Sequence, residues 1–360
     1  MPFLSISFTD FRNVQNETLD LLAREVYFIG DNGQGKSNLL ESMYLVSYGG
    51  SFRTRDDSEL VRNGQQAYSV RALYKNQAER TSTVSVVYKE KKKRIEKNAK
   101  VILDRKELID TIPCILYNHD DLDFASGSPE RKRFFIDQSL SMYDSSYIDV
   151  LRKYKKILKT RNQVLKDKRA DILESIDIQL VEIGLEVCKR RKKTIIDFNR
   201  VFSALYEEVS GLRDVHIQYG PSWKTDTVEQ VLGEVFARRA LDMSFGMTSS
   251  GPHRDRIRFM KGSIGFIPTA STGQRRLISL LLRTAQASYY TEVSGKLPVL
   301  LMDDVLLELD PEKRQRFTAL LPEYDQLFCT FLPGEPFERY KKTTTKVYDV
   351  SEGGWNERIH

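Results

Sequence analysis

The sequence has few cysteines and no long hydrophobic run. Its three cysteines, Cys114, Cys188 and Cys329, are far apart and form no C-x-x-C pair, which argues against a disulfide framework or a zinc site. No stretch approaches the roughly 18 apolar residues of a membrane-spanning helix. The first residues, which include Asp10, lack the basic region and apolar core of a signal peptide. We therefore expect a soluble protein of the reducing cytoplasm.

Internal repeats and low-complexity tracts are also absent, and the composition is that of a globular protein. The 360 residues, 40% of them hydrophobic and 29% charged, predict two domains or one large domain with an insertion. The formal net charge is +6. Residues 131–200 contain 18 Lys or Arg and 10 Asp or Glu, a surplus of +8 that leaves −2 for the rest. This concentration of positive charge indicates a polyanionic partner, either nucleic acid or an anionic membrane surface.

Strand patterns lie near both ends of the chain, and helix patterns lie between them. Residues 3–116 are expected to form mixed β-structure with one prominent helix. Long amphipathic helices are expected from Ser128 to about Asp242, with Asp144, Ser145 or Ser146 as a possible N-cap. Alternation returns at 257–266, and Val299 to Met302 reads as a buried strand. We predict a head formed by residues 1–118 and 245–360, with a mainly helical basic lobe, 119–244, inserted in it.

A glycine-rich loop matches the Walker A pattern G-x-x-x-x-G-K-S. A strand-like run ending at Ile29 precedes it, and a helical run from Ser37 follows it. This order lets backbone N–H groups and the helix N-terminus face the phosphates of ATP. Lys36 is predicted to reach the β- and γ-phosphates and to act in catalysis, and the Ser37 hydroxyl to ligate Mg²⁺. The predicted nucleotide-binding residues here are Gly30, Asp31, Asn32, Gly33, Gln34, Gly35, Lys36, Ser37 and Asn38. The alternative is that this segment is a glycine-rich turn that binds no phosphate and contains a lysine by coincidence.

Two acidic residues follow the strand-like run Val299 to Met302. A buried strand that delivers a carboxylate beside a phosphate loop is typical of a Walker B element, in which Asp303 holds Mg²⁺ directly or through water. Asp304 would then face the γ-phosphate and polarise the attacking water as a general base. The alternative is that Asp304 is a surface acid.

Between these elements lies Ala270 to Arg276, which resembles the signature motif of ABC-type ATPases. Alone, its Ser-x-Gly-Gln core is equally an ordinary helix N-cap. The resemblance implies that Ser271, Gly273 and Gln274 of one subunit close over the γ-phosphate held by another. Because the chain carries one copy of each motif, it implies an ATP-dependent homodimer.

Five stretches of the sequence resemble the RecF family of bacterial recombination-repair proteins, and they occur in the same order as in that family. They are Asp10 to Asn13, Gly30 to Glu41, Ser51 to Thr54, Gly251 to Asp255, and Asp303 to Val305 with Glu308 to Asp310. The resemblance implies an α/β fold, an ABC-type P-loop ATPase head with an inserted mainly helical lobe. It further implies a weak DNA-stimulated ATPase that uses ATP and Mg²⁺ as a switch in DNA replication and repair. The implied partners are double-stranded DNA at gaps or junctions and the RecO and RecR mediator proteins that load the recombinase, with no membrane partner.

One departure from the family pattern lies after Walker B. Leu307 stands where the family usually has a serine, which puts the dimer-facing contact of that loop in doubt. No switch histidine is present near Thr330, so slow hydrolysis is expected. Position alone assigns no role to Arg53 or Arg254, and a structural role is favoured for His253.

The central segment carries the candidate DNA contacts. A basic helix with one apolar stripe can bury one face and offer the other to phosphates. A solvated face without a partner is the alternative. We predict that such contacts position the chain on duplex DNA without reading bases. The candidates are Arg152, Lys153, Lys155, Lys156, Lys189, Arg190 and Arg191.

Three other functions share part of this pattern. A P-loop small-molecule kinase would share Walker A but need neither the signature nor a basic arm. A transporter ATPase would share all three motifs but normally carries a histidine after Walker B and has a membrane partner. A DNA-binding scaffold with little ATP turnover is the third alternative. Dependence of ATP hydrolysis on protein concentration and on DNA separates these functions from the ATP switch.

Overall fold

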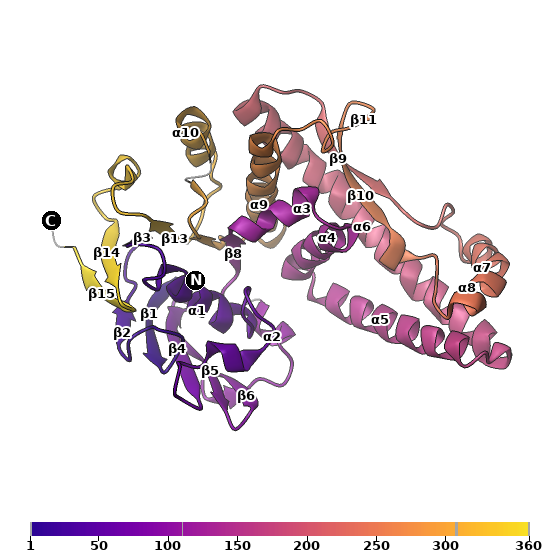
Figure 1. The fold of residues 1–360 in the computed structure, drawn as a ribbon, viewed down its shortest axis with the longest axis horizontal. Helices are drawn as coiled ribbons and strands as arrows, with labels where there is room; N and C mark the ends of the chain where they lie inside the picture. Colours follow the sequence, from indigo (N-terminus) through magenta and orange to yellow (C-terminus); the bar gives the residue numbers. More distant parts are fainter. Residues whose placement is uncertain (1, 110, 307–308, 359–360) are drawn as a thin grey trace. The chain divides into compact units, whose positions relative to one another are not determined.

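The computed structural model describes residues 2–109, 111–306 and 309–358 (Figure 1). The chain divides into two compact units: unit 1 comprises residues 1–120 and 290–360, and unit 2 comprises residues 121–289. These limits place residues 245–289 in the same unit as the predicted lobe. The assignment of 1–118 and 245–360 to a head and 119–244 to a lobe remains a prediction.

Unit 1 contains two six-stranded sheets. In the first, with order β2-β1-β4-β5-β6-β7, all neighbouring strands are antiparallel. Its strands are β1 (Phe3–Thr9), β2 (Thr18–Asp20), β4 (Tyr68–Lys75), β5 (Thr81–Lys89), β6 (Lys92–Lys97) and β7 (Lys100–Val101). The alternating residues of β1, β4 and β5 that predicted half-buried strands are confirmed.

The second sheet, β15-β14-β3-β13-β12-β8, is parallel from β14 to β8, and β15 is antiparallel to β14. Its strands are β3 (Glu25–Ile29), β8 (Cys114–Tyr117), β12 (Val299–Met302), β13 (Gln326–Phe331), β14 (Lys346–Ser351) and β15 (Gly354–Glu357). The sheet joins strands from near both ends of the sequence, so indigo and yellow segments lie side by side in Figure 1. β3, β12 and β13 are buried along their whole length, as expected of central parallel strands, and so is β8 at the edge of the sheet.

The main core of unit 1 joins both sheets to helix α1 (Lys36–Tyr48). Val26 and Phe28 of β3 and Phe328 of β13 pack in one cluster with Leu40 and Met43 of α1. Gly49 ends α1 in a left-handed conformation, with φ of 68°, which is the usual place for glycine after a helix. The unit's other helical segments are η1 (Asp57–Leu60), α2 (Lys106–Ile109), α10 (Pro311–Ala319) and η6 (Phe337–Arg339).

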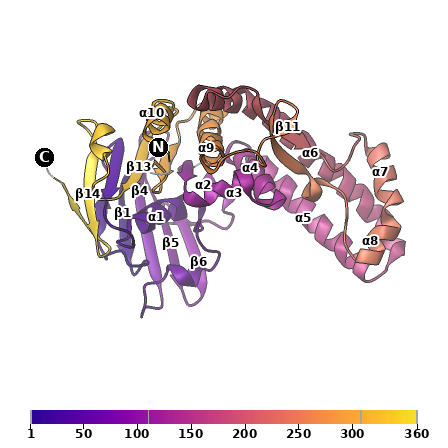
Figure 2. The ribbon, with the colours of Figure 1, turned by 45° about the horizontal axis from the view of Figure 1, so that its top comes forward.

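Unit 2 is built around two long helices, α5 (Ser145–Lys166) and α6 (Leu173–Ser210), which run side by side (Figure 2). The Asp144 side chain caps α5, as predicted, and the buried apolar side chains of this helix are Tyr147, Tyr154, Val164 and Leu165, whereas Leu151 and Leu158 of the same stripe are half-buried. The other elements are η2 (His119–Asp121), α3 (Leu122–Ser126), α4 (Pro129–Tyr143), η3 (Ala170–Ile172), β9 (Val215–Gly220), α7 (Val228–Ala237), α8 (Arg239–Phe245), η4 (Pro252–Arg254), β10 (Arg256–Lys261), β11 (Ile264–Gly265) and α9 (Thr272–Ser294); η2 begins in unit 1, and α9 ends there.

The expectation that the segment up to about Asp242 contains only helices was wrong at β9. This strand pairs antiparallel with β10, and its residues Val215 and Ile217 are buried, because their two-residue alternation matches a half-buried strand. Among the described residues, no helix is both long and apolar enough to cross a membrane.

Candidate nucleotide-binding site

The predicted phosphate loop connects the end of β3 to the start of α1. Gly33 and Gly35 have φ of 80° and 114°, a left-handed conformation that side chains with a Cβ rarely adopt. Gly35 is the N-cap of α1, and within the described part of the chain no side chain caps that helix end. Its first N–H groups are therefore left for an anion, as in other phosphate-binding helix N-termini.

Lys36 folds its side chain back over this loop. It is only 4% exposed, and its Nζ donates to the carbonyl oxygens of Gly30, at 2.8 Å, and Asp31, at 3.2 Å. The same Nζ lies 4.0 Å from Oδ2 of Asp304. The ammonium is thus held at the carboxyl ends of the parallel strands, where α/β sheets usually bind ligands.

Ser37 and Asp303 form the candidate magnesium site. The Ser37 hydroxyl donates to Oδ1 of Asp303 over 2.8 Å. Burial raises the pKa of Asp303, which the hydrogen bond from Ser37 opposes. Hydroxyl and carboxylate oxygens are ligands that Mg²⁺ prefers, usually beside water and phosphate oxygens. The two residues therefore fit the ion, since a cation would offset the cost of burying the carboxylate.

Asp304 lies beside this pair in a left-handed conformation, with φ of 52°. Its carboxylate is about one third exposed and accepts a hydrogen bond from the Thr330 hydroxyl over 2.7 Å. Parallel pairing of β12 with β13 and of β13 with β3 brings Asp303, Asp304 and Thr330 to the end of the sheet where the phosphate loop begins. Thr330 belongs to no motif that predicted a role for it.

A polar cluster supports the start of α1 and joins the predicted residue Asn38 to Arg12, Asn13 and Glu41, which no motif had assigned a role. Glu41, which is fully buried, accepts a bidentate pair from Arg12, at 3.0 Å for each bond. Arg53 donates to the Asn38 side chain over 2.6 Å, and Asn38 donates to Asn13 over 2.7 Å. The only sequence signal for Arg12, Asn13 and Glu41 was their presence in the stretches that resemble the RecF family.

The turn between β14 and β15 contacts the phosphate loop from the other side. The backbone N–H of Gly353 donates to the Gln34 carbonyl over 2.9 Å, and that of Glu352 donates to the Gln34 side chain over 2.7 Å. A Cβ on Gly353 would lie 1.8 Å from the carbonyl oxygen of Asn13. Only glycine fits this approach, and no local pattern predicted it.

The signature residues begin helix α9. The Ser271 hydroxyl accepts from the backbone N–H of Gln274 over 3.2 Å, and the Gln274 side chain accepts from the backbone N–H of Ser271 over 2.8 Å. This reciprocal pair is a capping box. Ser271 and Gly273 are exposed. The helix start is therefore pre-formed and faces solvent within its unit, whatever further role it has.

The candidate DNA contacts separate into two groups. Arg152, Lys153, Lys155, Lys156 and Lys189 are exposed on α5 and α6. Arg191 is only 4% exposed and pairs with Asp137 and Asp255, each at 2.9 Å. The prediction of Arg191 as a DNA contact was therefore wrong, because the side chain is buried and its charge is neutralised by these two aspartates.

Arg190 is an intermediate case. It is 25% exposed and donates to Glu186 and Asp144 over 2.6 and 2.7 Å. Binding a phosphate would require it to leave these carboxylates, so it is a weaker candidate than the lysines.

His253 has a structural environment. Its ring nitrogens bond to the Tyr154 hydroxyl at 2.7 Å and the Thr248 carbonyl at 3.0 Å. Burial lowers its pKa to about 4, so the ring is neutral near pH 7. Leu307 and Glu308 lie outside the described residues.

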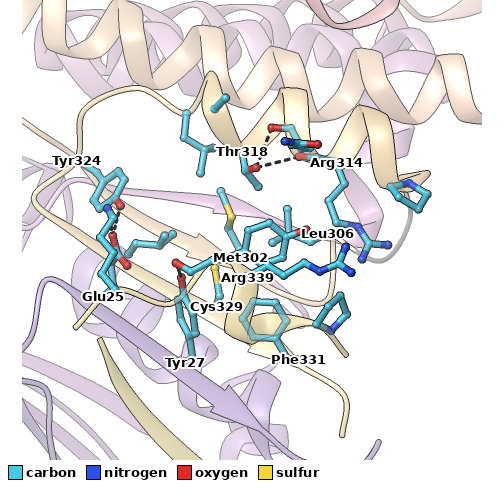
Figure 3. A pocket seen from close by; sticks show the side chains of 18 of the residues that line it. Glu25, Tyr27, Met302, Leu306, Arg314, Thr318, Tyr324, Cys329, Phe331 and Arg339 are labelled. Atoms are coloured by element: carbon cyan, nitrogen blue, oxygen red, sulfur yellow. Dashed lines mark hydrogen bonds and ion pairs between the residues drawn. The ribbon is translucent and has the colours of Figure 1, made fainter. Parts of the chain in front are cut away.

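A cavity of about 650 Å³ in unit 1 lies between the parallel sheet and helix α10 (Figure 3). Tyr27, Met302, Cys329 and Phe331 line it, and none of residues 30–37 does. Burial raises the pKa of the Cys329 thiol, which makes it unreactive near neutral pH. The predicted nucleotide site is thus the surface loop and not this cavity.

Known proteins match nearly the whole chain. Residues 3–354 match the family described as RecF/RecN/SMC N terminal domain. The DNA replication and repair protein RecF of Treponema pallidum (strain Nichols) is 52% identical over 97% of this chain and 99% of its own length. The RecF of Leptospira interrogans serovar copenhageni is 32% identical over 97% of each chain.

Solved structures agree with these relatives. The recombination mediator protein RecF with ATP, described as part of the RecFOR pathway, has a TM-score of 0.88 and 26% identity, covering 99% of this chain and 98% of that one. An Smc head bound to the C-winged helix domain of ScpA shares the fold, with a TM-score of 0.60 and 15% identity over 99% of this chain and 97% of that one. This chain therefore belongs to the RecF family of DNA replication and repair proteins and has the α/β fold of an ABC-type ATPase head.

Proposed function

We propose that this chain is an ATP-gated DNA-binding protein of recombinational repair. Two copies would close on ATP and grip double-stranded DNA at gaps or junctions, and weak hydrolysis would release them. The observation that carries the proposal is the grouping of Lys36, Ser37, Asp303 and Asp304 at one end of a parallel sheet. RecF with ATP is a mediator of the RecFOR pathway, so RecO and RecR are the proposed partners.

Each group of the site would have one task in hydrolysis. The phosphate loop and Lys36 would bind the β- and γ-phosphates. Ser37 and Asp303 would hold Mg²⁺, which would neutralise the phosphate oxygens. Asp304, whose carboxylate is one third exposed, would accept a proton from the attacking water.

The signature would complete the site in trans. Ser271 is already the cap of α9, with the helix start exposed. A pre-formed helix N-terminus can donate N–H groups to the γ-phosphate of a second copy without rearranging. ATP would then contact both subunits, and its binding would stabilise the dimer by a free energy that grows with the logarithm of the ATP concentration above Kd.

The test is ATP hydrolysis per subunit as a function of protein concentration, with and without duplex DNA. Specific activity that rises with concentration and increases with DNA supports a shared site. A flat, DNA-independent activity would instead support a P-loop kinase. Ser271→Arg, which adds bulk and charge at the exposed cap, should remove the concentration dependence, whereas Ser175→Arg on an exposed part of α6 should leave it intact.

A DNA-binding scaffold with little turnover is the second candidate. It is favoured by the absence of a switch histidine near Thr330 in the sequence. DNA affinity that is unchanged by ATP, in the wild type and in Lys36→Arg alike, would support it.

A further inference from the structure

Thr330 joins the two acidic residues of the Walker B element. It lies in β13, directly before the strand's last residue, and is 4% exposed. Its hydroxyl oxygen accepts the backbone N–H of Asp304 over 2.7 Å and lies 2.7 Å from Oδ1 of the same residue. The same oxygen is 3.3 Å from Oδ1 of Asp303.

A hydroxyl group has only one proton to donate. The shortest distance to an acceptor directs that proton to Asp304, whereas the contact with Asp303 is longer by 0.6 Å. A hydrogen bond to an ionised carboxylate is stronger than one between neutral groups. Thr330 therefore holds Asp304 at two points, the backbone N–H and the carboxylate.

Asp304 needs such support for two reasons. Its left-handed backbone, φ 52°, is unfavourable for a residue with a Cβ. In addition, its partly exposed carboxylate lies 4.0 Å from the Lys36 ammonium. Without the Thr330 hydroxyl, the carboxylate would be drawn toward Lys36, and an acid paired with that lysine is poorly placed to accept a proton from water.

We propose that Thr330 is a positioning residue for ATP hydrolysis, which keeps the Asp304 carboxylate directed at the attacking water and apart from Lys36. The inference rests on the proposed role of Asp304 as the general base. Thr330 is given no contact with the nucleotide. Loss of its hydroxyl should therefore slow the hydrolytic step and leave ATP binding unchanged.

The test compares Thr330→Val with Thr330→Ser. Valine keeps the shape of the side chain and removes the hydroxyl, and serine keeps the hydroxyl. Loss of a hydrogen bond to a charged group predicts a fall in kcat of about 10- to 100-fold for Thr330→Val. The KM for ATP should stay within about twofold, and Thr330→Ser should keep kcat within about threefold.

Thr345→Val is the matched control. Thr345 is also a buried threonine of unit 1 whose hydroxyl donates to a carboxylate, that of Glu25, over 3.1 Å. If Thr330→Val acted by loosening the fold, Thr345→Val would slow hydrolysis to a similar extent. An unchanged kcat for Thr345→Val supports positioning, and an equal loss would overturn it.

A double variant separates this inference from the proposed function. In an Asp304→Asn background, Thr330→Val should lower the residual rate by no more than about twofold, because residues that act as a unit are not additive. A full further loss would show that Thr330 acts independently of Asp304. Wild-type kcat in Thr330→Val would overturn the inference alone, whereas wild-type activity in Asp304→Asn would overturn both it and the proposed base.

Discussion

Units 1 and 2 place their buried charges in different surroundings. In unit 1, the buried Lys36 and the half-buried Asp303 lie at the end of a parallel sheet, where backbone N–H groups and the partly exposed carboxylate of Asp304 leave room for a ligand. In unit 2, Arg161, Arg191 and Arg283 are buried between helices and bonded to aspartates. The first arrangement is open on one side, and the second is closed.

In the basic segment, residues 131–200, some arginines are buried and paired with aspartates, whereas the lysines of α5 are exposed. Arginine can satisfy several acceptors at once through its planar guanidinium, and Arg161 reaches Asp177, Asp242 and Thr248 together. The lysines of α5 remain on the surface. Part of the positive charge in the segment is therefore internal and unavailable to DNA.

The largest expected effect is on the stability of unit 2. Arg161→Ala would leave Asp177 and Asp242 buried without their guanidinium partner, although Arg239 still reaches Asp177. We expect a loss of about 3–5 kcal/mol in the free energy of unfolding. Of the two tryptophans, Trp223 lies in unit 2 and Trp355 in unit 1, so Trp223 fluorescence in a Trp355→Phe background reports on this unit during urea unfolding.

The matched control for Arg161 is Arg169→Ala. Arg169 forms an exposed pair with Asp171, at 3.3 Å and with both side chains more than half exposed, so its loss should cost less than about 1 kcal/mol. Equal effects of the two substitutions would remove the distinction between internal and external arginines.

The second largest effect is on ATP hydrolysis. Lys36→Ala removes the ammonium from the phosphate loop, and we expect kcat/KM to fall by about 100-fold or more, since oriented charge dominates phosphoryl transfer. Lys75→Ala, on an exposed strand end, should be within about twofold of the wild type. A Lys36→Ala variant with more than half of the activity would exclude this loop as the catalytic site.

The third prediction concerns the open charges of unit 2. Replacing Lys153, Lys155 and Lys156 together by Gln should weaken duplex binding by about tenfold at moderate salt. The slope of log K against log salt should decrease by about 3, since each phosphate contact contributes about 0.9. Lys89, Lys91 and Lys92, exposed in unit 1, provide the control with the same change of charge. If both triple variants bind equally weakly, the arm has no special role.

The smallest effect is a pH dependence of stability. Burial lowers the pKa of His253 from 6.5 to about 4, so between these values the unfolded chain binds more protons than the folded one. Stability is therefore lost as the pH falls through this window. From pH 7.5 to 5.5 the contribution is about 1 kcal/mol. His253→Gln should reduce the acid-induced loss by that amount in urea unfolding, and an unchanged loss would show that the ring titrates normally.

Sequence alone predicted those parts of the site that lie in one continuous segment of the chain. Gly33, Gly35, Lys36 and Ser37 belong to a single loop, so their spacing fixes their geometry, and the Walker B strand was equally clear. Thr330 and the turn at Gly353 reach the site through the pairing of β13 and β14 with β3. Such long-range register leaves no local pattern in the sequence.

The same limit applies to unit 2. The apolar stripe of α5 gave its buried face correctly, because periodicity encodes burial. Whether an individual basic side chain lies inside depends on carboxylates supplied by other elements. Arg191 owes its burial to Asp137 of α4 and Asp255, and no pattern within α6 distinguishes it from Lys192.

The parallel sheet of unit 1 also sets the order in which the protein can be completed during translation. Glu25 of β3 bonds to Tyr324, 299 residues later, and β13 and β14 flank β3 on either side. At about 5–20 residues per second, roughly 15–60 s separate the synthesis of these neighbours. The phosphate loop emerges from the ribosome early. The strands β13 and β14, which flank β3, are synthesised only after all of unit 2. A nascent chain therefore cannot assemble its nucleotide site until β13, β14 and the turn at Gly353 have been synthesised.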